Sequence, residues 1–142
     1  MSFAIYHNFV INTSCKEVFH AISQPNHLDK WWTLKSSGTP KLGAVYNLNF
    51  TDKYDWYSIV SKFDTNTSIH FKMTKADADW NATTFGFDLE TRNNQTLVRF
   101  SHVNWPYQND HFKHSSFSWA LLLKGLKDYV EEGIVVPFEK RS

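Results

Sequence analysis

Several features that often reveal a protein's class are missing from this chain. It has a single cysteine, Cys15, so no disulfide can form within the chain. Its 15 lysines and arginines nearly balance 14 aspartates and glutamates, and no basic run occurs, which gives nucleic-acid binding no electrostatic support. No stretch approaches the roughly 20 apolar residues of a membrane span, and the N-terminus lacks the pattern of a signal peptide. Together these absences predict a cytoplasmic protein without a membrane span.

Motifs for common cofactors and reactions are missing as well. There is no G-x-G-x-x-G and no Walker-type loop, so no nucleotide cofactor is predicted. The nucleophile elbow G-x-S-x-G is absent, and Cys15 has no paired catalytic motif around it. The sequence therefore predicts no cofactor and contains no recognisable set of catalytic residues.

Aromatic residues, by contrast, are plentiful. They make up 17% of the 142 residues, with 12 Phe, 6 Tyr and 6 Trp. So many large flat side chains predict an aromatic core or an aromatic-walled pocket, which would suit an apolar ligand. The length suits one domain with one core, so residues 1–142 are expected to form a single domain.

The dominant segment runs from Asp110 to Gly133 and has the periodicity of an amphipathic helix. Gly133 suits the left-handed position that ends a helix. Because the chain before it reads mostly as strands, the apolar face of this helix is expected to pack on a sheet. The residues predicted to form that face are Phe112, Ser116, Trp119, Leu123, Leu126 and Val130.

The rest of the chain predicts one strand, two short helices and about five further strands. A first strand covers about ten residues from Phe3, and Ser14 with Glu17 forms a capping box that starts a short helix. Pro25 suits the first turn of a second helix, and Lys35 to Gly43 reads as a loop. Short connections join the later strands, which predicts an antiparallel sheet of α+β class. Those strands are expected at residues 46–50, 56–63, 68–74, 83–90 and 96–102.

The alternation of apolar and polar residues along these strands predicts which side chains line a cavity between sheet and helix. Residues 56–63 stay ambiguous, because Trp56, Ser58 and Val60 compete with Tyr57, Ile59 and Phe63 for the inner face. Trp31 and Trp32 are adjacent, so they cannot share one helix face; both could seal the core, or one could face a ligand. The predicted ligand-binding residues are Trp32, Tyr46, Phe71, Phe85, Phe87, Phe100, His102, Ser116, Trp119 and Leu123.

Two of these residues are polar. His102 continues the inner alternation of Val98 and Phe100, so it is either a satisfied histidine at the rim or a buried polar contact in the cavity. Ser116 is a small residue in the apolar stripe, which would leave space near the helix start. His102 with His111 and His114 could form a zinc site. The helix places His114 toward solvent, so a solvated pair is the favoured interpretation and no metal is predicted.

Several motifs in order resemble the START/birch-pollen-allergen (SRPBCC) superfamily, and within it the branch named after the activator of heat-shock protein ninety ATPase. These motifs span nearly the whole chain. They are V-F-x-A-I at Val18 to Ile22, Q-P-x-H-L-x-K-W-W at Gln24 to Trp32, L-G at Leu42 and Gly43, N-W-P at Asn104 to Pro106, and W-A-L-L-L-K-G-L-K-D-Y-V-E-E-G at Trp119 to Gly133.

The resemblance implies a helix-grip fold, in which a curved antiparallel sheet of about six strands wraps around the C-terminal helix. It also implies a hydrophobic cavity, since relatives bind lipids, sterols, polyketides or hormones. The first hypothesis is therefore a binding protein for an apolar or aromatic, lipid-like small molecule. The alternatives are a cyclase or aromatase-type enzyme with His102 moving a proton, and a stress-associated or co-chaperone-like interaction module with exposed Trp105 and Tyr107. Against co-chaperone activity, the chain has no room for the second domain of the named activator.

Overall fold

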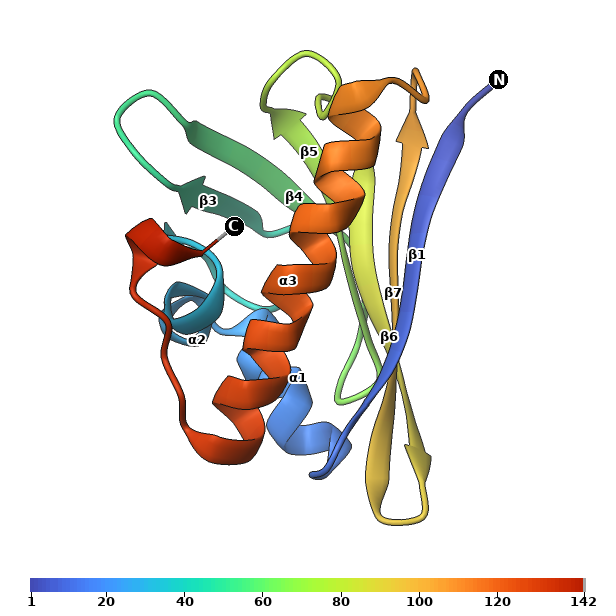
Figure 1. Cartoon of the computed structure of the whole chain (residues 1–142), viewed down its shortest axis with the longest axis vertical. Helices are drawn as coiled ribbons and strands as arrows, with labels where there is room; N and C mark the ends of the chain where they lie inside the picture. The colour runs from blue at the N-terminus through green and yellow to red at the C-terminus, as the bar shows by residue number, and fades with distance from the viewer. Residues whose placement is uncertain (142) are drawn as a thin grey trace.

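The computed structural model describes residues 1–141. A long helix lies across one face of an antiparallel sheet, and two short helices follow the first strand (Figure 1). In chain order the elements are β1 (Phe3–Ile11), α1 (Cys15–Ser23), α2 (Pro25–Trp31), β2 (Lys35–Ser37), β3 (Val45–Asn49), β4 (Asp55–Asp64), β5 (Ser68–Lys75), β6 (Thr84–Arg92), β7 (Gln95–Trp105), α3 (Asp110–Glu132) and a 3-10 turn η1 (Phe138–Lys140).

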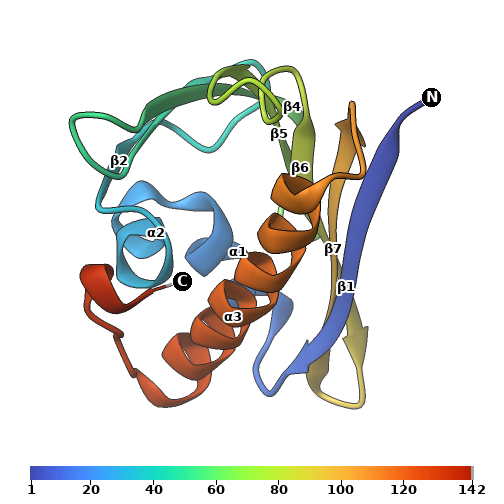
Figure 2. The ribbon, with the colours of Figure 1, turned by 45° about the horizontal axis from the view of Figure 1, so that its top comes forward.

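The sheet has the strand order β1-β7-β6-β5-β4-β3-β2, and every neighbouring pair is antiparallel. It is curved and does not close, so that β2 to β4 arch over the two short helices (Figure 2). All three α-helices lie on its concave side, and α3 begins near the end of β7 (Figure 2). This arrangement confirms the predicted α+β helix-grip fold.

The sheet has one strand more than the roughly six expected, because Lys35–Ser37 forms β2 where a loop was predicted. These three residues pair with Asn49, Leu48 and Asn47 of β3. So short a segment has no alternation that a sequence pattern could reveal. Its conformation follows from the free edge of β3, which offers backbone partners to any chain that passes beside it.

A β-bulge resolves the ambiguous strand. Ser58 and Val60 of β4 are buried and pair with Met73 and Phe71, whereas Lys62 already pairs with His70. The extra residue between Val60 and Lys62 shifts the alternation, so Phe63 also turns inward and packs edge-on against Phe19. Both candidate faces were therefore right, each for one part of the strand.

Helix α3 begins and ends where its sequence indicates. The side chain of Asn109 accepts a hydrogen bond from the Phe112 backbone N–H, and Gly133 ends the helix with a φ of 71°. The buried stripe is Phe112, Ser115, Trp119, Leu123 and Leu126. The expected Ser116 is only half-buried, since it lies on the side of the helix that faces β1.

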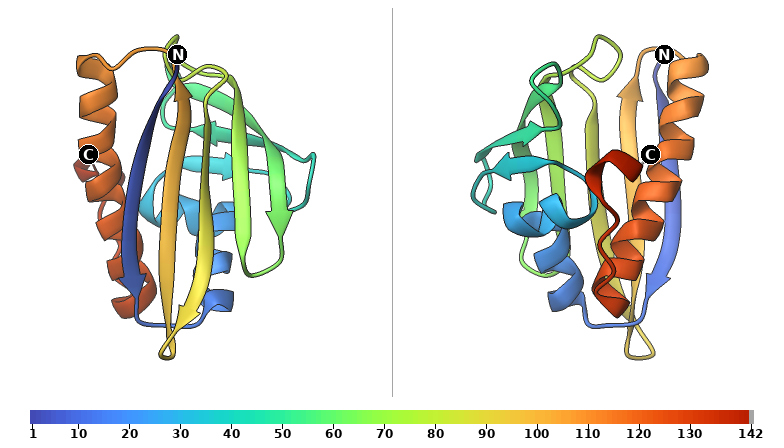
Figure 3. Two further views of the ribbon diagram at one scale, coloured as in Figure 1. Left: turned by 90° about the vertical axis from the view of Figure 1, so that its right-hand side faces the viewer. Right: turned by 60° about the vertical axis from the view of Figure 1, so that its left-hand side comes forward.

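Helix α3 also covers the free edge of β1. Lys127 donates to the Val10 carbonyl at 2.6 Å, and the Asn12 backbone N–H donates to Glu131 at 2.7 Å. On the other side of the helix, the C-terminal segment runs back toward α2 (Figure 3). There Arg141 donates to the carbonyls of Asp29, Lys30 and Thr33, which caps the end of α2. Among the helices of residues 1–141, none is long and apolar enough to cross a membrane.

Candidate functional site

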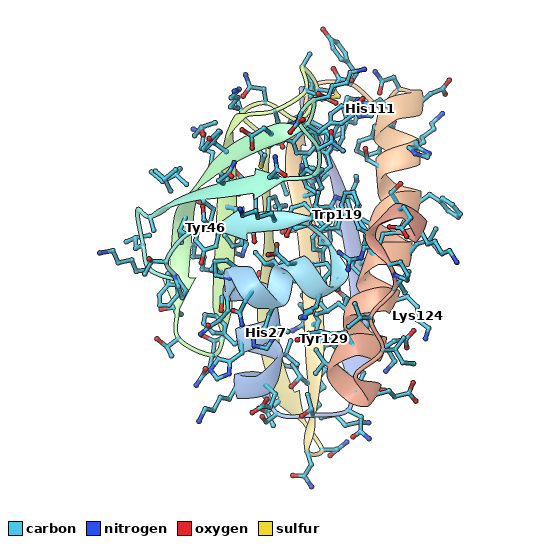
Figure 4. The ribbon with its side chains drawn as sticks, turned by 90° about the vertical axis from the view of Figure 1, so that its left-hand side faces the viewer. His27, Tyr46, His111, Trp119, Lys124 and Tyr129 are labelled. Carbon is cyan, nitrogen blue, oxygen red and sulfur yellow. The ribbon has the colours of Figure 1, made fainter. Side chains whose placement is uncertain are left out.

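A pocket of about 440 Å³ opens between the start of α3, the β3–β4 hairpin and the loop that follows β5. This volume is within the range typical of small-molecule sites, roughly 300 to 1,000 Å³. Figure 4 places His111 at this end of α3, whereas Trp119 extends from the middle of the helix toward the sheet. The lining residues are Trp32, Phe50, Tyr54, Trp56, Asp77, Trp80, His111, His114, Ser115, Ser118, Trp119 and Leu122.

Trp80 forms the wall that separates this pocket from the core. Its ring centroid lies 4.5 Å from that of His102 and 5.8 Å from that of Trp119. Trp56, the next ring of the wall, lies 4.9 Å from Trp80. The Trp80 indole N–H donates to the Ser115 hydroxyl at 3.4 Å, so the loop after β5 is tied to α3 at the pocket wall.

The polar groups of the pocket lie on one side, where the loop after β5 meets the first turns of α3. His111 approaches Asp79 with Nδ1 3.2 Å from Oδ2, and Asn109 donates to the same oxygen at 3.2 Å. A carboxylate can only accept, so Nδ1 of His111 carries the proton and Nε2 of the neutral ring is an acceptor. Asp77 adds an exposed carboxylate to the rim.

His102 lies behind the Trp80 wall and is fully buried. The Trp119 indole N–H donates to its Nδ1 at 3.0 Å, which leaves Nε2 protonated and 2.8 Å from the Thr83 hydroxyl. Thr83 in turn donates to the Trp80 carbonyl at 2.6 Å. Burial lowers the pKa of His102 to about 3. With both ring nitrogens bonded and no charge at neutral pH, His102 is built as a structural residue, and this geometry gives no support to proton transfer by it.

The structure brings two of the ten predicted ligand-binding residues, Trp32 and Trp119, to this pocket. Trp32 stacks on Trp31 and contacts Trp119, so it both seals the core and faces the pocket. Five others are fully buried in the aromatic core and line none of the described pockets; these are Tyr46, Phe71, Phe85, Phe87 and Phe100. Tyr46 also uses its hydroxyl, which donates to the Ser23 carbonyl at 2.6 Å.

Two further predicted residues face the β1 side of α3. Leu123 lines a smaller groove of about 220 Å³ beside His7 and Phe9, and Ser116 approaches His7 through both its hydroxyl and its carbonyl. One expectation of the interaction hypothesis is wrong. Trp105 is completely buried against His102 and Phe112, whereas Tyr107 is exposed as expected.

Sequence reasoning missed most of the pocket's lining. The sequence did contain one signal for Ser115. It lies four residues before Trp119, so around the helix it is closer to the Trp119 side chain than Ser116 is. Trp80 stands in an otherwise polar connection, where a large indole would be costly to leave in water. Asp79 and His111 are 32 residues apart, and no spacing rule joins them. Within residues 1–141, no group of three metal-ligating side chains lies close enough to hold an ion.

The open curved sheet, the long helix gripped on its concave face and the aromatic pocket at one end define a START-like helix-grip protein. The sequence model described as "Activator of Hsp90 ATPase homolog 1-like protein" matches residues 12–131. The chain therefore belongs to the activator of Hsp90 ATPase homolog 1-like family. No curated protein matches the chain in sequence.

Solved structures agree with this assignment. The solution structure of the Aha1 dimer from Colwellia psychrerythraea is 32% identical over 92% of this chain and 98% of its own, with a TM-score of 0.83. The protein SSP2350 from Staphylococcus saprophyticus is 19% identical and covers 95% and 96% of the two chains, with a TM-score of 0.80. CalU16 from Micromonospora echinospora is 14% identical and covers 93% and 77%, with a TM-score of 0.72. The last two support the fold alone.

Proposed function

We propose that this protein binds a small molecule with an apolar or aromatic body in the pocket at the start of α3. One observation carries the proposal: four of the chain's six tryptophans line this single pocket. Trp32, Trp80 and Trp119 are buried and form the inner wall of the pocket, whereas Trp56 is half-buried. A wall of aromatic rings is a common way for proteins to bind flat apolar ligands. The helix-grip fold agrees with such a role but does not by itself establish it.

The pocket rather than the deep core is the proposed site, because the core has no room. Phe71, Phe85 and Trp119 pack with ring centroids 5.0 to 5.6 Å apart, and the polar atoms of Tyr46 and His102 bond within the protein. A ligand would therefore stack against Trp80 and Trp56 and leave the core as it is. Ser115, a small side chain in the buried stripe of α3, keeps the pocket open at this level.

A screen by tryptophan fluorescence tests the proposal. Flavonoids, sterols and fatty acids are titrated into the protein, and saturable quenching with a Kd below roughly 100 μM is the expected result for at least one compound. Ser115→Leu adds side-chain volume inside the pocket and should weaken that binding at least tenfold. Ser116→Leu makes the same chemical change one residue further along α3, outside the pocket, and should leave the Kd within twofold. Absence of saturable quenching by every compound would contradict the proposal.

A further inference from the structure

We infer that the pocket selects ligands that carry a positive charge, as a protonated or quaternary amine on an apolar or aromatic body. This inference rests on the proposed function, and it concerns which small molecules the pocket favours. Three features of the pocket support it: the sign of its formal charge, the faces of its aromatic rings, and the polarity of two of its hydrogen-bonding groups.

The formal charge of the lining is negative. Asp77 is the one lining residue of the described chain with a side chain that is ordinarily charged at pH 8, and no lysine or arginine lines the pocket. The nearest basic group of the hairpin, Lys53, places its ammonium 5.5 Å from the centroid of the Tyr54 ring without lining the pocket. In the small adjoining pocket, Arg141 is accompanied by Glu139, so this neighbour adds no net charge.

The aromatic wall is suited to a cation. Five of the rings that line the pocket are those of Trp32, Phe50, Tyr54, Trp56 and Trp80. The ring centroid of Phe50 lies 5.2 Å from that of Trp56 and 5.5 Å from that of Trp32, so the rings form a continuous surface. A ring face carries negative electrostatic potential, and an ammonium within about 6 Å of it gains roughly 0.5 to 2 kcal/mol. The Lys53 contact shows that Tyr54 already holds one ammonium in this way.

Two of the polar groups, His111 and Asp77, offer acceptors. The contact of His111 with Asp79 commits Nδ1 as the donor, so the neutral ring can present only an acceptor at Nε2. The carboxylate of Asp77 is an acceptor. A carboxylate ligand would meet like charge at Asp77 and find no lysine or arginine among the lining residues to pair with it. An amine would find both a carboxylate and aromatic faces.

Three benzyl alcohols that differ only in the para substituent test the inference: trimethylammonium, tert-butyl and carboxylate. The first two have nearly the same shape, so their ratio of Kd values isolates the charge. Titrations are followed by the indole N–H signals in NMR spectra, at pH 8 to keep imidazoles neutral and at about 20 mM salt to limit screening. The trimethylammonium compound should bind at least fivefold more tightly than the tert-butyl compound, and the carboxylate should bind most weakly.

Asp77→Asn should at least halve this preference, because it weakens the binding of the trimethylammonium compound. The variant keeps the backbone carbonyl that accepts from Trp80 and Asn81, so the loop is retained. Asp64→Asn is the matched control. It removes the same charge at the far end of β4, about 30 Å along the strand from Asp55, and should preserve the preference.

Equal or tighter binding of the tert-butyl compound, or of the carboxylate, overturns the inference. The proposed function then still stands, because binding of a small molecule to the pocket has been observed. A preference that persists undiminished in Asp77→Asn overturns the role of the carboxylate. If neither these probes nor the compounds of the fluorescence screen bind, both the inference and the proposed function fail.

Discussion

The two sides of Trp80 show how the same residue types produce opposite environments. Behind it, around His102, rings of β5 to β7 and α3 pack against one another, and each ring nitrogen of His102 has a partner inside the protein. In front of it, Trp56 and Phe50 contact neighbours on one side and line a pocket on the other. Aromatic content alone therefore did not distinguish core from site.

The two regions differ in what the side chains of α3 contact. Near Trp119 the helix is close enough for its side chain to reach His102 and Phe100 on β7. Nearer its start, the facing residue is Ser115, and the opposite wall comes from the β3–β4 hairpin and from the loop that carries Trp80. A small side chain on the helix and a curved sheet leave a gap there that the core does not have.

Truncating one ring in each region should give the largest contrast. Phe85 is fully buried between Phe71, Trp32 and Trp119, so Phe85→Ala should lower the free energy of unfolding by about 3 to 5 kcal/mol. Trp56→Ala removes a half-buried ring at the pocket and should cost about 1 to 2 kcal/mol while altering ligand affinity. Urea denaturation measures both. Equal losses would mean that the pocket side is as closely packed as the core.

Acid should weaken the core side through His102. Burial lowers its folded-state pKa to about 3, below the ordinary value near 6.5 that applies when the chain unfolds. The unfolded chain binds the extra proton, so stability is complete above pH 6.5 and falls as the pH decreases toward 3, by about 1.4 kcal/mol per unit. Between pH 6.5 and 4.5 the loss should be roughly 2 to 3 kcal/mol.

Denaturation at several pH values checks this, with two glutamine variants. His102→Gln removes the titration and should flatten the slope, whereas His114→Gln changes an exposed histidine and should leave it unchanged. Burial also lowers the pKa of His27, which adds a smaller contribution of the same sign. Identical slopes in the two variants would refute the assignment to His102.

Much of the fold could be predicted because it rests on local signals. The alternation of Val98, Phe100 and His102 correctly gave the inner face of β7, and the period of α3 identified the helix that the sheet grips. The bulge in β4 and the short strand β2 could not be predicted in this way. Both are set by a neighbouring strand, and a change of register of one residue reverses every side chain that follows.

The pocket was less accessible to sequence reasoning for a physical reason. Inward-facing residues of the strands were expected to line a cavity, but in the middle of the sheet the helix and α2 fill that space. The space that remains is bordered by loops and by a hairpin. Asp77, Asp79 and Trp80 lie outside any periodic segment, so only the folded chain brings them beside His111. The ligand-binding roles of the ten nominated residues remain predictions.

The smallest expected effect concerns Thr83, whose hydroxyl links the two regions. It is 2.8 Å from Nε2 of His102 on the core side and donates to the carbonyl of Trp80 on the pocket side. Thr83→Val keeps the volume but removes the hydroxyl, and it leaves the buried N–H of His102 without an acceptor. The expected loss of stability is about 1 to 2 kcal/mol. Thr83→Ser keeps the hydroxyl and loses one methyl group, which should cost about 0.8 kcal/mol.

The two variants also differ in a signal that packing alone would not change. In Thr83→Ser the His102 ring should keep its Nε2 proton, whereas in Thr83→Val that tautomer loses its acceptor, and the ¹⁵N shifts of the ring and the indole N–H of Trp119 should both move. If Thr83→Val is as stable as the unmodified protein and leaves these signals in place, the hydroxyl does not hold His102. The position of Trp80 between the pocket and the core would then be maintained by ring packing alone, through its contacts with His102 and Trp119.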